Sequence, residues 1–271
     1  MTDRPHRKQQ IRSAFDRAAA SYDAAALVQR CISDELARLA TRHPCHRQVE
    51  RALDAGCGTG YGLQWLSDSM PQALRIALDF APAMLARVES QADSDPDRVA
   101  LCADIESLPL AGASLDVAWS SLALQWCDPA AAFIELARVL RPGAHAWIAT
   151  LGPRTLWELR EGFSAVDDAD HVIHFHAPEH WIDAARMSGF RVLESDRRTI
   201  PALAGTLRGL LRDIKAIGAH SVGPQRRRAP LGRAAWRRLE TDYERHRRED
   251  GLLPATYDVI LLALEKSGDP A

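Results

Sequence analysis

Residues 53–60 read LDAGCGTG, a short apolar run that leads into three closely spaced glycines. Glycines at the end of a buried strand allow the backbone to turn tightly and to approach a ligand without interference from a Cβ atom. A glycine loop of this kind is weak evidence alone, because dinucleotide-binding enzymes have a similar one. Their spacing, Gly-x-Gly-x-x-Gly, is absent here, which argues against a dinucleotide enzyme.

Three carboxylates accompany this loop at regular intervals. Asp54 precedes the glycines, Asp79 ends the next apolar segment, and Asp104 ends the one after that. The carboxyl ends of parallel strands form the ligand-binding edge of such a sheet. There Asp54 can meet an amino group, Asp79 can bridge two ribose hydroxyls, and Asp104 can accept a hydrogen bond from an adenine amino group. A turn or a helix cap explains any one of these acids, but all three together indicate a nucleoside-containing ligand.

Strands and helices alternate on both sides of the loop. Strands are expected at residues 52–57, 75–79, 99–104, 115–120, 144–151, 190–199 and 257–264. Helices are expected at residues 61–69, 82–91, 129–140, 154–166 and 178–188. This rhythm predicts an α/β fold, Rossmann-like and doubly wound, with a mostly parallel seven-stranded sheet.

Both ends of the chain add helices to this core. Ile11, Phe15, Ala18, Ala19 and Tyr22 recur at helical spacing, and a second helix is expected over about residues 24–40. Helices at residues 203–217 and 231–248 fall before the last strand. We therefore divide the chain into an N-terminal helical lid (1–50), a ligand-binding core (51–200), a helical insertion that covers the substrate (201–252), and a last strand that completes the core sheet (253–271).

The composition narrows the class of protein. The chain has 271 residues, of which 46% are hydrophobic and 26% charged, so it can bury a sizeable core. No apolar run reaches the ~20 residues that a membrane helix needs, and the polar N-terminus resembles no secretory signal. Five scattered cysteines without a C-x-x-C pair favour a cytoplasmic location over a disulfide framework. We expect no membrane association.

The near-zero net charge of −2 hides an uneven distribution. Residues 52–110 contain three Arg and nine Asp or Glu, whereas residues 224–248 contain nine Arg and three Asp or Glu. The second segment predicts a basic surface for an acidic partner, with solvated helix faces as the alternative. It lacks the interleaved aromatic residues of a stacking platform, so we expect no nucleic-acid binding.

Four histidines, His171, His174, His176 and His180, form the densest polar cluster. Their spacing matches neither H-E-x-x-H nor a zinc-finger pair, so no metal site is expected. As general bases they would be relevant if the acceptor of the reaction were a hydroxyl or an amine.

Over roughly residues 50–151, the glycine loop and the three acids together resemble class I S-adenosylmethionine-dependent methyltransferases. This resemblance implies S-adenosyl-L-methionine as the cofactor and S-adenosyl-L-homocysteine as its product. The cofactor-binding residues that it implies are Asp54, Gly56, Cys57, Gly58, Gly60, Asp79, Phe80, Met84, Asp104, Ile105 and Ser120.

Segments outside the core resemble one family, the malonyl-acyl-carrier-protein O-methyltransferases of biotin synthesis (BioC). These segments are residues 7–15, 18–23, 120–127, 150–159, 213–219 and 254–257. The chain departs from the family pattern at Ser121, where Asn is frequent, and at His220 and Ser221, where Thr and His are usual. These departures bear on the details of substrate contacts and leave the glycine loop unaffected.

The resemblance implies methyl transfer to the free carboxylate of a malonyl thioester on acyl-carrier protein, or on coenzyme A. The ester hides the charge, so that the malonyl unit can prime pimeloyl synthesis for biotin. A carboxylate is already a nucleophile, so no general base is expected, and a dry pocket that aligns donor and acceptor is sufficient. The alternatives are a methyltransferase for a small carboxylic acid such as trans-aconitate or for a quinone-type hydroxyl, and a non-catalytic subunit that binds S-adenosylmethionine.

Under this interpretation, Tyr22 in the lid has a catalytic, positioning role near the sulfonium. We expect Gln125 and Trp126 to line the substrate pocket, and an arginine to pair with the malonyl carboxylate. The candidates for this arginine are Arg197, Arg198, Arg208 and Arg212. The basic run from Arg226 to Arg248 would face the acidic carrier protein.

Overall fold

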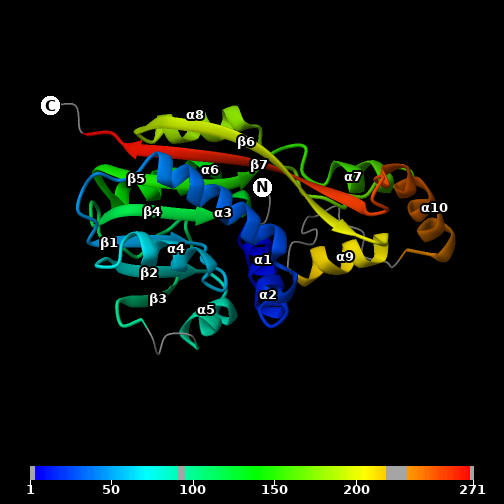
Figure 1. The fold of residues 1–271 in the computed structure, drawn as a ribbon, viewed down its shortest axis with the longest axis horizontal. Coiled ribbons are helices and arrows are strands. Elements are labelled where there is room, and N and C mark those ends of the chain that lie inside the picture. Colours follow the sequence, from blue (N-terminus) through cyan, green and yellow to red (C-terminus); the bar gives the residue numbers. More distant parts are fainter. Residues whose placement is uncertain (1–3, 91–94, 218–230, 269–271) are drawn as a thin grey trace.

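The computed structural model describes residues 4–90, 95–217 and 231–268, and it contains one seven-stranded sheet (Figure 1). The strands are ordered β3-β2-β1-β4-β5-β7-β6. β7 runs antiparallel to both of its neighbours, and the other neighbouring pairs are parallel. The predicted mostly parallel, Rossmann-like sheet is therefore confirmed. The strands are β1 (Arg51–Ala55), β2 (Leu74–Asp79), β3 (Arg98–Cys102), β4 (Leu115–Ser121), β5 (Leu140–Leu151), β6 (Phe190–Ala204) and β7 (Leu253–Lys266).

Helices cover both faces of the sheet, and further helices lie beyond one end of it. The described helices are α1 (Arg4–Ala18), α2 (Tyr22–Ala25), α3 (Leu27–Arg42), α4 (Tyr61–Ser69), α5 (Pro82–Glu89), α6 (Pro129–Val139), α7 (Trp157–Ser164), α8 (Pro178–Met187), α9 (Leu207–Ala216) and α10 (Arg233–Tyr243), with the 3-10 turns η2 (Leu124–Trp126) and η3 (Glu244–His246). α3, α4 and α5 pack on one face and α6 and α8 on the other. These five helices form two layers, one on each face of the sheet.

Each layer has its own apolar core, as expected for strands that are buried on both faces. On the α3 side, Trp65 stacks on Trp119 with ring centroids 4.9 Å apart and meets Trp147 edge-on at 5.6 Å. On the α6 side, Phe133 packs edge-on against Trp181 and Phe190. The central strands are buried on both faces, which places their polar residues at the strand ends.

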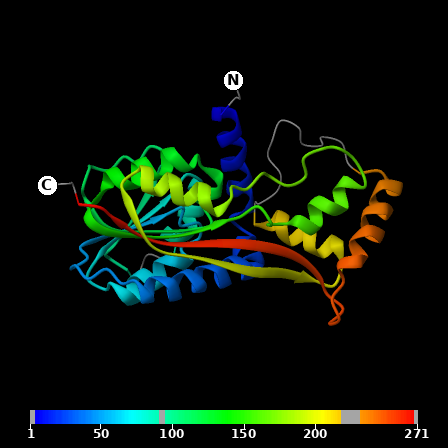
Figure 2. The ribbon, with the colours of Figure 1, turned by 90° about the horizontal axis from the view of Figure 1, so that it is seen from above.

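The last two strands are much longer than the others. β6 pairs with β7 from Phe190–Lys266 through to Ala204–Leu253, and the pair projects beyond the sheet toward α7, α9 and α10 (Figure 2). β6 extends five residues past its expected end at Thr199, and β7 begins four residues before Tyr257. The segment expected to be a helical insertion, residues 201–252, therefore begins in strand and ends where β7 begins, and its helices rest on an extension of the core sheet.

Two further boundaries differ from expectation. The first helix ends at Ala18, and Tyr22 begins a separate short helix after a turn at residues 19–21. Residues 141–143, which separate the expected helix at 129–140 from the expected strand at 144–151, lie within β5, where Leu140 already pairs with Leu115. Gly143 has a φ of +76° and the β4–β5 register shifts in this region, so the glycine allows an irregular strand to continue.

None of the described helices is both long enough and apolar enough to cross a membrane. The five cysteines are all free.

Candidate functional site

The glycine loop joins β1 to α4 and is shaped by close contacts. Gly56 has a φ of +81°, and a Cβ atom there would lie 2.1 Å from the Cβ of Ala123. A Cβ atom on Gly62, in the first turn of α4, would lie 2.6 Å from Trp119 Nε1 and 2.9 Å from Asp54 Oδ2. Only glycine fits at these two positions, which brings the backbone of the loop against the end of β1.

Asp54 is the most perturbed acid of the site. It is 2% exposed, and its Oδ2 atom has no hydrogen-bond partner among the described residues. Burial, followed by the nearby Asp79, raises the pKa of Asp54 to about 8. Trp119 Nε1, which also borders Gly62, is likewise buried without a partner. Buried polar atoms are normally paired, so these two orphaned atoms indicate a place for a polar ligand that offers a donor to Asp54 and an acceptor to Trp119.

Asp79 is fixed at the end of β2 by backbone donors. Gly58 donates its N–H to Oδ2 at 2.9 Å, and Ala81 donates to Oδ1 at 2.8 Å. Burial raises the pKa of Asp79 to about 6, although these backbone hydrogen bonds oppose the shift. Each carboxylate oxygen keeps a lone pair, so the group can still accept two hydroxyl donors.

A cavity of about 1030 Å³ lies over this loop; we call it the cofactor cavity. It is lined by nine of the predicted cofactor residues: Asp54, Gly56, Cys57, Gly58, Asp79, Phe80, Met84, Asp104 and Ile105. Gly60 and Ser120 do not line it, and their direct binding to the cofactor stays a prediction. Gly60 has a φ of +94° at the start of α4 and shapes the turn. Ser120 is fully buried and donates to the carbonyl of Ala55 at 2.7 Å, because alternation along β4 turns Trp119 and Ser121 to the cavity instead.

Asp104 lies two residues beyond β3 and is already engaged by the N-terminal helix. Lys8 of α1 pairs with Asp104 and also with Glu106, at 2.9 Å from the latter. The backbone N–H of Glu106 donates to Asp104 Oδ1 at 3.0 Å. Lys8 thereby joins the predicted lid to the far rim of the cofactor cavity.

Other contacts also join α1 and α2 to this rim. Phe15 meets Phe80 and Trp126 edge-on, with ring centroids 6.2 and 5.6 Å apart. The N–H of Ala83, at the start of α5, donates to Asp16 Oδ1 at 3.1 Å. In the glycine loop, Thr59 donates its hydroxyl to Asp23 Oδ1 at 2.6 Å, and Arg30 and Arg87 lie within 3.7 Å of the same carboxylate.

A second cavity of about 1120 Å³ lies between the sheet edge, α7 and α9; we call it the acceptor cavity. Its lining is mostly apolar, with contributions from Leu156, Phe163, Ile173, Leu211 and Ile214 among others. The two cavities share five lining residues: Phe15, Tyr22, Gln29, Leu122 and Trp126. The two cavities therefore join at these residues, to which the lid contributes Tyr22. A group bound in one cavity can contact a group bound in the other at this junction.

The predicted substrate residues divide into two groups. Trp126 lines both cavities, and Gln125 lines the acceptor cavity and donates to the Leu122 carbonyl at 2.6 Å. The four candidate arginines line neither cavity, and the pairing of one of them with a substrate carboxylate stays a prediction.

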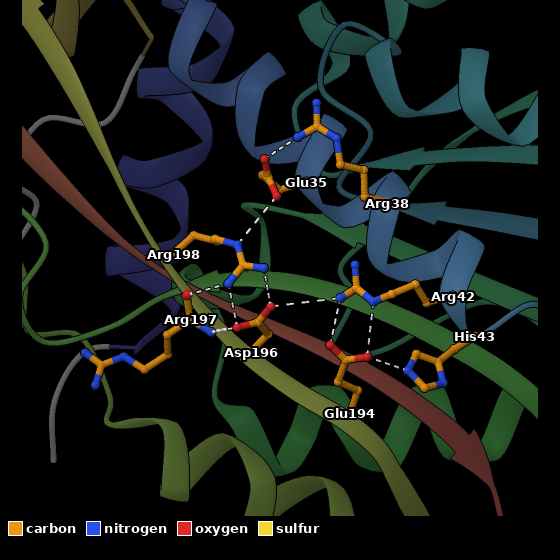
Figure 3. Close-up of polar contacts among 8 residues, drawn as sticks. All are labelled: Glu35, Arg38, Arg42, His43, Glu194, Asp196, Arg197 and Arg198. Carbon is orange, nitrogen blue, oxygen red and sulfur yellow. Dashed lines mark hydrogen bonds and ion pairs between the residues drawn. The ribbon is translucent and has the colours of Figure 1, made fainter.

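Two of these arginines are already paired with acids, and Figure 3 shows the partners of Arg198. Arg197 donates to both oxygens of the buried Asp258, at 2.8 and 2.9 Å. Arg198 pairs with Asp196 at 2.6 Å and lies 3.6 Å from Glu35 of α3. Asp258 and Glu35 lie far from these arginines in the sequence, so no local pattern could indicate their ion pairs.

The other two arginines lie on α9. The guanidinium of Arg208 covers the ring of Trp236 at 5.2 Å, and Arg212 is 79% exposed beside Asp213. Of the predicted basic run, Arg226, Arg227 and Arg228 lie outside the described residues. Arg245, Arg247 and Arg248 pair with Glu161, Glu244 and Asp250 respectively.

The histidine cluster is arranged by stacking. His176 stacks on His180 with centroids 4.3 Å apart, and burial lowers the pKa of His176. His171 stacks on Phe163 at 3.8 Å and contacts Asp167 at 2.7 Å. Within residues 4–90, 95–217 and 231–268, no three His, Cys, Asp or Glu side chains converge as a metal site would require.

Sequence reasoning missed several residues that line the cavities. Lys8, Thr59 and Trp119 line the cofactor cavity, Lys215 and Tyr257 line the acceptor cavity, and Gln29 lines both. Thr59 lies in the glycine loop, and Lys8, Lys215 and Tyr257 lie in segments that resemble the family, but those patterns assign no role to the four side chains. Gln29 and Trp119 carry no local motif, because their contribution depends on which elements pack together.

The sequence is similar to those of known methyltransferases. Residues 53–148 match a family model described as a methyltransferase domain. The malonyl-(acyl-carrier protein) O-methyltransferase of Laribacter hongkongensis is 44% identical over 93% of this chain and 87% of its own. The biotin biosynthesis bifunctional protein BioHC of Cellvibrio japonicus is 37% identical over 96% of this chain and 50% of its own.

A solved structure has the same fold at low identity. It is the geranyl diphosphate C-methyltransferase from Streptomyces coelicolor A3(2), in complex with Mg²⁺, geranyl diphosphate and S-adenosyl-L-homocysteine. It is 13% identical and superposes with a TM-score of 0.54 over 86% of this chain and 79% of its own. The likeness confirms the methyltransferase fold.

Proposed function

Since the chain belongs to the malonyl-(acyl-carrier protein) O-methyltransferase family, we propose that it transfers a methyl group from S-adenosyl-L-methionine to the free carboxylate of a malonyl thioester on acyl-carrier protein. The product is the malonyl methyl ester that primes pimeloyl synthesis for biotin. The observation that carries this proposal is the junction of the two cavities at Tyr22, Gln29 and Trp126. An apolar acceptor channel that ends beside a nucleoside site suits an acyl thioester arm.

The residues of the cofactor cavity fit S-adenosylmethionine. The orphaned, buried carboxylate oxygen of Asp54 suits its amino group, and Asp79 at the end of β2 suits its ribose hydroxyls. Phe80, Met84 and Ile105 provide apolar walls for the adenine. Once bound, the cofactor supplies an electrophilic methyl group on a positively charged sulfur.

The protein's part in the reaction is alignment and exclusion of water. A malonyl carboxylate oxygen at the junction attacks the methyl carbon, and the carbon–sulfur bond breaks as the carbon–oxygen bond forms. No proton moves, so no general base is needed, and the opposite charges of donor and acceptor cancel. A dry, preorganised site favours such a step. We propose that α1 and α2, anchored by Lys8, Asp16 and Asp23, form the lid that keeps this junction dry.

For the carrier protein we propose a docking face made by α9 and α10. Arg208, Arg212 and Lys215 recur at i, i+4 and i+7 along α9, which places them on one face of the helix. Lys215 also lines the acceptor cavity, and the adjacent α10 contributes Arg233 and Arg237. This basic face shares Arg233 and Arg237 with the predicted run, in which three of the six described arginines pair with acids of the protein. It would guide an acidic carrier to the cavity mouth.

The docking face predicts a charge-dependent Michaelis constant. Arg212→Glu should raise the apparent KM for malonyl-carrier protein several-fold at low ionic strength and little at high ionic strength, because salt screens exposed charges. The matched control is Arg51→Glu, which makes the same charge change at the start of β1, the opposite end of the strand from the glycine loop. Steady-state kinetics at two salt concentrations test this; equal effects of the two variants would contradict the docking face.

The role in biotin synthesis is tested in a bacterium that needs biotin because it lacks its own malonyl-carrier-protein methyltransferase. Expression of this chain should restore growth without biotin, and the Asp79→Asn variant should restore it poorly. Growth restored by neither, with both proteins present in the cells in soluble form, would contradict the role in biotin synthesis.

A further inference from the structure

Three uncharged polar side chains meet where the cofactor and acceptor cavities join. Tyr22 begins α2, Gln29 lies in the first turns of α3, and Tyr257 lies in β7. Tyr22 and Gln29 line both cavities, and Tyr257 lines the acceptor cavity. Tyr257 is 4% exposed, and it interacts with the amide of Gln29 and with the Tyr22 phenol.

One atom of this group lacks a partner. Gln29 Oε1 is buried and makes no hydrogen bond to the described residues, although the residue lines both the cofactor cavity and the acceptor cavity. An amide offers two donor hydrogens and an acceptor. Since the oxygen and nitrogen ends of a glutamine can exchange by rotation, the orphaned end can present an N–H donor to a ligand. Leaving a buried polar atom unpaired is costly, and a ligand that accepts a hydrogen bond removes that cost.

Both phenols keep their protons at physiological pH. Burial raises the pKa of Tyr257 to about 12, and burial together with the nearby Asp79 raises the pKa of Tyr22 still further. Each phenol therefore stays protonated: the Tyr22 hydroxyl can donate to a ligand, and the Tyr257 hydroxyl can donate to Gln29 Oε1 when the amide turns its N–H toward that ligand. The cations that line the cofactor cavity are committed elsewhere, with Lys8 on Asp104 and Glu106 and Arg30 on Asp23.

We propose that Tyr22, Gln29 and Tyr257 form a neutral hydrogen-bond cradle that holds the acceptor carboxylate beside the methyl donor, in place of the arginine expected from the sequence. This inference rests on the proposed function and assigns its specificity for a free carboxylate to these three positioning residues.

Uncharged donors match the electrostatics of the reaction. The carboxylate loses its negative charge as the ester forms, so a fixed cation beside it would stabilise the starting state more than the transition state. Hydroxyl and amide donors still satisfy a carboxylate that has left water, whose burial without hydrogen bonds would be unfavourable. They leave most of the charge on the nucleophile, where the positive sulfonium can attract it.

The test compares the binding of two carrier proteins, one with a malonyl and one with an acetyl group, in the presence of S-adenosyl-L-homocysteine. The acetyl group lacks the carboxylate, so the ratio of the two dissociation constants reports recognition of that group alone. Tyr257→Phe and Gln29→Met should each reduce the preference for malonyl about 10- to 100-fold, the effect of one hydrogen bond to a charged group. Binding of the acetyl carrier should change little.

Two controls separate this role from a structural one. Tyr243→Phe also removes a buried hydroxyl, one that donates to the Pro254 carbonyl outside both cavities, and it should keep the preference for malonyl. Lys215→Gln removes the cation that lines the acceptor cavity and should lower both affinities equally.

The outcomes distinguish the cradle from the proposed function. A wild-type protein that binds both carriers equally, or a preference for malonyl that survives in Tyr257→Phe and Gln29→Met, would overturn the cradle. Loss of the preference only in Lys215→Gln would overturn it in favour of an ion pair. The proposed function is tested separately by turnover of the malonyl carrier, which does not depend on these ratios.

Discussion

At the scale of single residues, Asp54 sets the chemistry of the cofactor cavity. Its carboxylate lies at the end of β1, where Gly62 lets α4 pack against it and where Oδ2 finds no partner. Desolvation holds its pKa at about 8, so in the free protein it is mostly protonated at neutral pH. A ligand ammonium reverses that preference, because an opposite charge favours the ionised form.

This linkage makes cofactor binding dependent on pH. Because the pKa of Asp54 is raised in the free protein and falls when a cation binds, binding should release a proton near pH 7, and affinity should rise from pH 6 toward pH 8. Titration calorimetry in two buffers of different ionisation enthalpy measures the proton release. Asp54→Asn should bind about 10- to 100-fold more weakly at pH 8; the same pH dependence in this variant would show that another group titrates.

At the scale of elements, α3 connects the lid to the sheet. Its first turns carry Gln29 and Arg30 at the cavities, and its C-terminal end is held to β6 by the ion-pair network of Figure 3. There Glu194 accepts from Arg42 at 2.7 Å and contacts His43 at 2.6 Å. These partners lower the pKa of Glu194 to about 2.

The network predicts a modest, pH-dependent stabilisation. A carboxylate whose pKa is lowered by folding stabilises the protein above its unfolded pKa, and this contribution disappears as the pH falls through the folded pKa. Glu194→Gln should therefore lower Tm by about 2–4 °C near pH 7, for a loss of about 1 kcal/mol in a partly exposed network. Thermal unfolding of both proteins should converge as the pH falls from about 4.5 toward 2; a constant gap would mean that packing rather than charge was lost.

The lid itself is the second element to test. Removal of residues 1–22 deletes Lys8, Phe15 and Tyr22 and should abolish turnover, because the junction would open to water. Lys8→Met is the gentler change: it removes the ion pairs to Asp104 and Glu106 but keeps the helix, and it should lower the rate while the thermal stability changes little. A truncated protein that folds, as shown by circular dichroism, and retains full activity would contradict the lid.

At the scale of the whole molecule, local patterns predicted the core well. The glycine loop, the strand–helix rhythm and Asp79 depend on residues adjacent in the chain, and the structure places them as expected. Local patterns could not predict that Trp119 and Ser121, and not Ser120, line the cofactor cavity. The register of β4 with β1 and β5 decides which side of the strand faces the cavity.

Long-range pairing explains the other differences. The sequence alone allows Arg197 to bind a substrate carboxylate, but in the structure β7 places Asp258 beside it. Tyr257 and Gln29 are separated by most of the chain, and the packing of α3 over the sheet unites them. The full length of β6 and β7 could not be predicted from local patterns either, because their outer halves are strands only through pairing with each other beyond the core.

The most direct test of the account is the site of methylation on the malonyl arm. Purified protein is incubated with S-adenosyl-L-methionine and malonyl-carrier protein, and the phosphopantetheine arm is examined by tandem mass spectrometry, with trans-aconitate as a competing acceptor. The account predicts one added methyl group, carried as an ester on the terminal carboxylate of the malonyl group. Methylation of trans-aconitate with none of the malonyl arm would contradict it.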